Sequence, residues 1–482
     1  MNTYKIIKGF TWTAIEKFSI QFAQFIIGII IARLVSPSEY GILGILMVFI
    51  NISQVFIDSG LGSALIYNND LKKEDVQTTF TFNLIVSLVL YIILYLTSPY
   101  IEVFYKLDNL SLYIRVSGIV LLINSLIIVP ISQLKVWMNF RALAISSIIS
   151  TIFSGTIGIY LAYNGYGIWA LIIQLLSRSL FQCILLILQC KWLPNFSFYR
   201  TSFYKLYKFG INVFSASIFT KLVEEGLVLL IGKLMTPYSL GLYTRANQFS
   251  SLPSTSLGSI VSSVLFPSLS SIKNNDKEFY KIYVKSIEYQ GLVSIPTFFI
   301  IVLICEPMIR LFLTEKWIEV VPILQILAMS RILLPVANIT EQAMNAKGRS
   351  DLFLSQQSVK LVTKSILVLI AIPFGILCVA IADAVYTLFQ FFITNYYGNK
   401  IIENNTQLII KKIYPFIIIG VVSLLLSFFF STKISNDILN ILVSSLCYII
   451  IYIGIISLCY KEKYFFPILK NIKTVINKRH IK

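Results

Sequence analysis

Apolar runs of about twenty residues recur along nearly the whole 482-residue chain. A helix needs about this length to cross roughly 30 Å of hydrocarbon, whereas a transmembrane barrel would show short segments of alternating polarity. Only 13% of the residues are charged, against about 25% in an ordinary soluble domain. The sequence therefore predicts an all-α membrane protein. Because the first apolar run is long and contains Glu16 and Lys17, we expect it to remain a membrane helix rather than act as a cleavable signal.

The pattern predicts about fourteen transmembrane helices: two sets of six, followed by two more. The expected spans are residues 10–34, 40–67, 77–97, 110–138, 142–163 and 167–190, then 209–234, 239–269, 279–313, 320–346, 352–373 and 376–397, and finally 410–430 and 438–459.

An internal repeat relates the two sets of six. Residues 30–43 recur 200 positions later, so that Pro37 and Gly41 match Pro237 and Gly241. Proline cannot continue the preceding helix and glycine allows close packing in the next one, so each copy predicts a tight turn between two helices. With an offset of 208, the matches continue as Pro99 with Pro307, Phe104 with Phe312, Arg141 with Arg349 and Gly167 with Gly375.

Duplication of six helices defines the expected domains. They are an N-lobe (1–200), a C-lobe (201–405), and two extra helices with a basic tail (406–482). Because six is even, both lobes enter the membrane from the same side, which gives two pseudo-symmetric lobes about an axis along the membrane normal. Such an architecture suits alternating access to a substrate held between the lobes.

Positive charge predicts the orientation. The formal net charge is +18 and every second connection between spans is basic, which places both termini in the cytoplasm. The basic tail either grips anionic lipid head groups or is a solvated topology determinant. No motif supports binding of nucleic acid.

Several motifs resemble one transporter family. The segments that carry the resemblance are 58–66, 165–171, 243–249, 315–317 and 347–353. With these segments the chain resembles, over nearly its whole length, the polysaccharide-transport branch of the multidrug/oligosaccharidyl-lipid/polysaccharide exporter superfamily, and most of all its colanic-acid and teichuronic-acid exporter type. One departure is Asn247, where the family pattern has aspartate, and this puts charge pairing at that position in doubt.

The resemblance implies a flippase in a bacterial-type cytoplasmic membrane. Its substrate would be a polyprenyl-diphosphate-linked oligosaccharide, moved from the inner to the outer leaflet, where it is polymerised. The implied structure is a V-shaped pair of six-helix lobes with two trailing helices. The implied partners are this lipid-linked glycan, membrane lipids and polysaccharide polymerase machinery.

Cations within the spans are the candidate substrate ligands. Ionisable groups at membrane depth are costly and by default face a cavity, and a diphosphate needs positive partners there. We expect Lys17 and Arg178 from the first half, and Lys221, Arg245 and Arg331 from the second half, to bind it. Neutralising ion pairs are the alternative role for the two lysines.

Those pairs follow from sequence spacing. Lys17 adjoins Glu16, and Lys221 lies one helical turn from Glu224 and Glu225.

Acidic residues at depth predict ion coupling. We expect Glu225 and Asp383 to bind Na⁺ or a proton and so to couple transport to an ion gradient. Pairing with Lys221 or with hydroxyl groups is the alternative role for these acids.

Other classes of function have little support. The single histidine lies in the tail, the six cysteines lack metal or redox spacing, and no P-loop is present. We therefore predict no enzyme, no catalytic residue, no metal site and no cofactor. The alternatives are a drug or cation antiporter of the same superfamily, a membrane polysaccharide polymerase or ligase, and a non-transporting scaffold.

Overall fold

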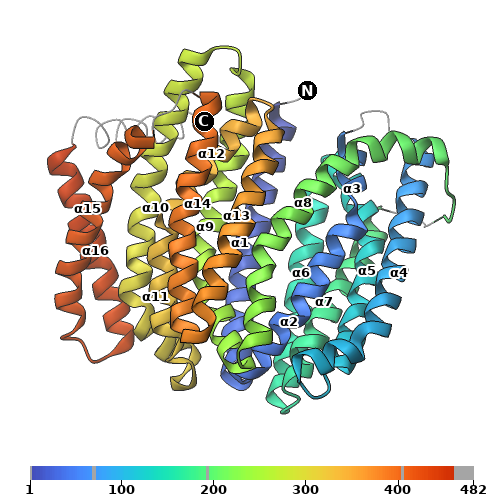
Figure 1. The fold of residues 1–482 in the computed structure, drawn as a ribbon, viewed down its shortest axis with the longest axis horizontal. Helices are drawn as coiled ribbons and strands as arrows, with labels where there is room; N and C mark the ends of the chain where they lie inside the picture. Colours follow the sequence, from blue (N-terminus) through green and yellow to red (C-terminus); the bar gives the residue numbers. More distant parts are fainter. Residues whose placement is uncertain (1–2, 68–71, 191–194, 403–405, 461–482) are drawn as a thin grey trace. The chain divides into compact units, whose positions relative to one another are not determined.

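The computed structural model describes residues 3–67, 72–190, 195–402 and 406–460, and all regular structure in these ranges is helical (Figure 1). The first half holds α1 (Thr3–Leu34), α2 (Pro37–Asp58), α3 (Leu61–Tyr67), α4 (Lys73–Tyr105), α5 (Leu110–Val136), α6 (Phe140–Tyr163) and α7 (Ile168–Cys190). Next come α8 (Arg200–Leu234), α9 (Pro237–Ser271), α10 (Asp276–Leu313), η1 (Glu315–Trp317), α11 (Val320–Ser330), η2 (Arg331–Leu333) and α12 (Leu334–Ala346). The last are α13 (Ser350–Ala371), η3 (Ile372–Phe374), α14 (Ile376–Ile402), α15 (Thr406–Ser431) and α16 (Asp437–Cys459).

The prediction of a many-helix membrane protein is confirmed. Twelve helical segments in the described ranges are long and apolar enough to cross a membrane. The seventh and eighth expected spans, α8 and α9, are each 35 residues long but are not among the twelve. One reason is that α8 carries Lys221, Glu224 and Glu225 within about one turn. Fourteen is therefore an approximate number of spans.

The chain forms two compact units, Met1–Thr244 and Arg245–Lys482. In the first unit, α8 packs against α2, α3 and α4. In the second, α10, α15 and α16 pack against one another (Figure 1). The lobe boundaries near residues 200 and 405 derive from the sequence repeat and stay a prediction.

Both copies of the repeated turn cap a helix with a hydroxyl side chain. The Ser36 hydroxyl accepts a hydrogen bond from the Glu39 amide (3.4 Å), and the Glu39 carboxylate accepts one from the Ser36 amide (2.8 Å), with Pro37 in the first turn of α2. At the start of α9, the Thr236 hydroxyl accepts from the Ser239 amide (3.2 Å). The reciprocal pairing in the first copy satisfies amides that the helix itself leaves without partners.

The two repeated glycines lie at a crossing of α2 with α9. A Cβ added to Gly41 would collide with the carbonyl of Pro237, and one added to Gly241 would collide with the carbonyl of Pro37. Each copy of the repeat thus packs its glycine against the proline of the other copy. Only glycine allows the two backbones to approach this closely.

Two expected spans are interrupted. The span predicted for 40–67 breaks at Ser59 and Gly60, which have φ values of 46° and 70°, because the Gly60 backbone lies directly against that of Gly210 on α8. The span predicted for 320–346 is interrupted by η2, which begins at Arg331. Each region still counts as one candidate membrane span, Pro37–Leu65 and Val320–Ala346, so both expected spans are confirmed and each contains a break in its helix. Apolar periodicity predicts the span but does not locate the break.

Candidate functional site

A polar cavity of about 350 Å³ lies in the first unit, between α2, α3, α5 and α8. This volume falls in the ordinary range for small-molecule sites, about 300–1,000 Å³. Its polar lining includes two amides and three charged groups, contributed by Asn51, Gln54, Asp58, Lys135 and Lys221.

Asp58 is held on the cavity wall by the break after α2. The carboxylate accepts a hydrogen bond from the Gly62 amide (3.2 Å), an amide that the break has turned toward it. The same break leaves Ser132, on α5, close enough to donate to the Gly62 carbonyl (3.2 Å). The 58–66 motif therefore forms one wall of the cavity.

Lys221 enters the cavity from α8 with its own acids beside it. Its ammonium lies 2.6 Å from the Glu224 carboxylate and 4.0 Å from that of Glu225. Asn51 donates to Glu225 across the helix interface (2.8 Å). The neutralising pairs considered from the sequence are thus present around Lys221, and Lys221 also faces the cavity.

Lys135 supplies the second positive group. It occupies the last turn of α5, its side chain is exposed, and it forms no ion pair within the described ranges. Its ammonium interacts electrostatically with the Asp58 carboxylate, but it lacks the close ion pair that Lys221 makes with Glu224.

The two cations predicted from the first half do not line this cavity. Lys17 is exposed on α1 and Arg178 is half-buried on α7, and within the described residues neither forms a hydrogen bond or ion pair. Glu16 accepts from the Ser147 hydroxyl (2.9 Å) rather than pairing with Lys17.

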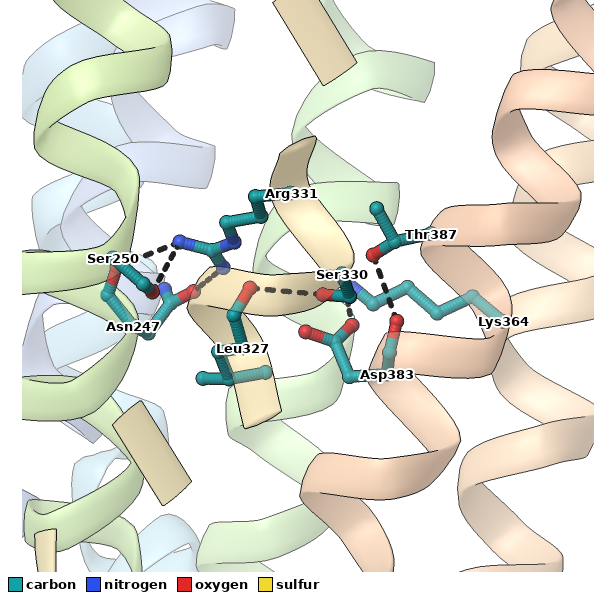
Figure 2. A network of polar contacts seen from close by, with 8 residues as sticks. All are labelled: Asn247, Ser250, Leu327, Ser330, Arg331, Lys364, Asp383 and Thr387. Atoms are coloured by element: carbon teal, nitrogen blue, oxygen red, sulfur yellow. Dashed lines mark hydrogen bonds and ion pairs between the residues drawn. The ribbon is translucent and has the colours of Figure 1, made fainter. Parts of the chain in front are cut away.

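Arg331 anchors η2 to α9 in the second unit. One guanidinium nitrogen donates to the Asn247 carbonyl (2.9 Å) and to the Ser250 hydroxyl (2.6 Å), and a second nitrogen donates to the Asn247 amide oxygen (Figure 2). The neutral amide at position 247 therefore accepts a charge-assisted hydrogen bond, although it carries no charge of its own.

Arg245 is also buried, in the first turns of α9. It donates to the Gln248 side chain (2.6 Å) and its guanidinium carbon lies 5.9 Å from the centre of the Trp317 ring. Both arginines are held by neighbouring groups in this conformation. Direct contact of either with phosphate stays a prediction.

Replacing Arg331 with methionine is expected to destabilise the protein by about 2–5 kcal/mol, because it leaves buried acceptors on α9 without their donors. The measurement is the thermal unfolding midpoint of the purified, detergent-solubilised protein. Arg310→Met is the matched control, since Arg310 is about half exposed and pairs with Glu306 at the surface. Equal midpoints for the two variants would contradict the anchoring role.

Asp383 carries an ion pair on the other side of η2. Lys364, on α13, places its ammonium 3.6 Å from the Asp383 carboxylate on α14 (Figure 2). One turn earlier on α13, the buried Lys360 pairs with Glu341 of α12 (2.6 Å). Glu225 lies in the first unit and Asp383 in the second, so a joint ion-coupling role for them stays a prediction.

Sequence reasoning missed part of the cavity. Lys135 is one of the basic connection residues that predict the orientation, while Asn51 and Gln54 carry no charge and so are not among the candidate ligands. Both amides lie in an otherwise apolar run, so uncharged polar residues at membrane depth were the available signal.

These features define a class of protein. Long apolar helices, a polar cavity with two ammonium groups and buried ion pairs at membrane depth are typical of a multi-pass membrane transporter. The chain belongs to the family described as "Polysaccharide biosynthesis protein", whose model matches residues 30–322.

Curated relatives cover most of the chain. The teichuronic acid biosynthesis protein TuaB of Bacillus subtilis is 27% identical over 86% of this chain and 87% of its own length. The succinoglycan biosynthesis transport protein ExoT of Rhizobium meliloti is 24% identical over 69% and 67%. The lipopolysaccharide biosynthesis protein WzxC of Escherichia coli is 20% identical over 72% and 71%.

Solved structures share the fold. The lipid II flippase MurJ in an inward closed conformation matches with a TM-score of 0.79 at 17% identity, over 94% of this chain and 99% of that one. An inward-facing multidrug MATE transporter of the MOP superfamily matches with a TM-score of 0.61 at 15% identity, over 81% and 98%. The resemblance to polysaccharide-transport proteins drawn from the sequence is confirmed by the family and the curated relatives, and the solved structures show the shared fold.

Proposed function

We propose that this protein is a flippase, not an enzyme, which moves a polyprenyl-diphosphate-linked oligosaccharide from the inner to the outer leaflet of a bacterial-type cytoplasmic membrane. The observation that carries the proposal is the cavity of the first unit, in which Lys135 and Lys221 face a polar space of about 350 Å³. Relatives named for teichuronic acid and succinoglycan biosynthesis support the glycan class.

The cavity chemistry fits an anionic head group. A diphosphate cannot cross hydrocarbon without compensating charge. The Lys135 ammonium supplies such a charge: it interacts with the Asp58 carboxylate but makes no close ion pair in the described ranges. In the proposed mechanism the phosphate also draws Lys221 away from Glu224. The lysine exchanges one anionic partner for another, so its positive charge is neutralised throughout. The amides of Asn51 and Gln54 supply donors and acceptors for sugar hydroxyls.

The proposal also includes the conformational change of the lobes and the coupling of transport to an ion gradient. The two lobes alternate access to the two leaflets, both termini face the cytoplasm, and polymerase machinery takes the product in the outer leaflet. Arg245 and Arg331 contribute from the C-lobe, and Lys17 and Arg178 from the N-lobe. Glu225 and Asp383 link the cycle to a gradient of Na⁺ or of protons. A cation antiporter of the same fold fits less well, because the cavity lining holds two ammonium groups and one carboxylate, that of Asp58.

A cellular experiment tests the function. Cells from which the gene has been deleted are expected to lose the surface polymer and to accumulate its lipid-linked repeat unit, and a plasmid copy should restore both. The control is a deletion of the glycosyltransferase that makes the repeat unit, which removes the polymer without accumulation. Normal polymer in the deleted strain, or loss of polymer without accumulated lipid-linked unit, would contradict the proposal.

A further inference from the structure

A polar stripe runs along one face of α13. Gln356, Lys360 and Lys364 are spaced four residues apart and so lie on the same side of the helix. Gln356 and Lys360 are fully or almost fully buried, and the Lys364 side chain is only 14% exposed. Both lysines meet a carboxylate from a neighbouring helix, Glu341 for the first and Asp383 for the second.

The ammonium of Lys364 is held from two sides. Its nitrogen lies 3.6 Å from the Asp383 carboxylate, whose side chain is 6% exposed, and 5.3 Å from the centre of the Tyr386 ring, one turn further along α14. A carboxylate and an aromatic face are both favourable partners for a cation. The lysine therefore occupies the place beside Asp383 where a free cation would bind.

The surroundings of Asp383 otherwise resemble those of an ion site in a transporter. The hydroxyl of Thr387 donates to the Asp383 carbonyl (2.8 Å), and the neighbouring span is interrupted at η2, between the Arg331 network and the Lys364 pair (Figure 2). Interrupted helices beside a buried carboxylate commonly coordinate Na⁺. Here the ammonium already neutralises the carboxylate, and a metal ion beside it would be repelled by the lysine.

We propose that Lys364 is a tethered cation that fills the alkali-metal position at Asp383, so that this carboxylate binds no Na⁺. If the protein is the proposed flippase, the inference also excludes Na⁺ as the coupling ion at Asp383. Only this consequence rests on the proposed function. The binding claim concerns the residues themselves and is testable without transport.

The test measures Na⁺-specific stabilisation of the purified full-length protein. Thermal unfolding midpoints are compared in NaCl and in choline chloride at equal ionic strength. For the unaltered protein we expect the same midpoint in both salts. For Lys364→Met, which leaves the buried carboxylate uncompensated, we expect Na⁺ to raise the midpoint by about 2 °C or more.

Two further variants separate the site from a general salt effect. Lys364→Arg keeps a positive charge and should show no Na⁺ effect. Asp383→Asn combined with Lys364→Met should abolish the effect seen with Lys364→Met alone. A Na⁺ effect in the unaltered protein that Asp383→Asn removes would overturn the proposal, as would a folded Lys364→Met protein without a Na⁺ effect.

Misfolding of a variant, failure of the flippase function and failure of the Na⁺ claim give different results. If Lys364→Met does not fold, the comparison of the unaltered protein with Asp383→Asn decides: a Na⁺ effect lost in Asp383→Asn overturns the claim, and its absence in both supports it. Glycan export is measured separately in cells. Failure of the unaltered protein to export would overturn the flippase function and leave the Na⁺ result standing.

Discussion

Glycan export is expected to fall on the order of 100-fold when Lys135 and Lys221 are both replaced by glutamine. Both residues line the cavity of the first unit, and each charge-assisted contact with phosphate contributes about 1.5–3 kcal/mol. Glutamine keeps the length and polarity of the side chain and removes the charge. The measurement is surface polymer per cell at matched protein level in the deletion strain.

The single variants and a control make this test specific. Lys135→Gln should have the larger single effect, since its ammonium is not paired with a carboxylate in the described ranges, whereas Lys221 already shares its charge with Glu224. Lys281→Gln is the control, because this lysine is exposed on α10 and is not one of the residues that line the cavity. Full export by the double variant would contradict a role for the cavity in transport.

Replacing Gly41 or Gly241 with alanine is expected to destabilise the protein by about 1–3 kcal/mol for each change. A methyl group at either position collides with the main-chain carbonyl of the proline in the other copy of the repeat, so the crossing of α2 with α9 must open. The measurement is the thermal unfolding midpoint, together with the amount of protein in the membrane.

Gly454→Ala provides the matched control. This glycine is in the middle of α16 and no atom lies within 4 Å of an added Cβ, so alanine should be neutral or slightly stabilising in the helix. Midpoints for Gly41→Ala and Gly241→Ala that equal that of Gly454→Ala would contradict the close crossing.

Sequence alone predicted the fold class because its signal is repeated. Crossing the hydrocarbon core of a membrane requires long apolar helices, and such runs recur along the chain. The capped Pro-Gly turn occurs twice, at Pro37 and Pro237, where α2 and α9 begin in the structure. The break at Gly60 could not be predicted in this way, because the Gly210 backbone that lies against it comes from another helix. The break at Arg331 has a local signal in Pro335, which has no N–H to donate to the Arg331 carbonyl.

Pairing of charges was only partly predictable. The acids beside Lys221 lie within one turn of the same helix, so spacing revealed them. The partners of Asp383 and Lys360 come from other helices, and sequence distance carries no information about such contacts. Likewise, Asn247 carries no charge, so the sequence predicted no ion pair at this position. In the structure its side-chain oxygen accepts a hydrogen bond from Arg331.

The most direct test of the account is lipid-linked glycan translocation in reconstituted vesicles. Purified protein is incorporated into liposomes that hold a polyprenyl-diphosphate oligosaccharide, and a membrane-impermeant sugar-modifying enzyme reports the fraction of glycan in the outer leaflet. The account predicts that the unaltered protein makes nearly all of the glycan accessible, while the Lys135→Gln, Lys221→Gln double variant leaves about the outer half accessible, as in vesicles without protein. Equal accessibility with and without the unaltered protein would contradict it.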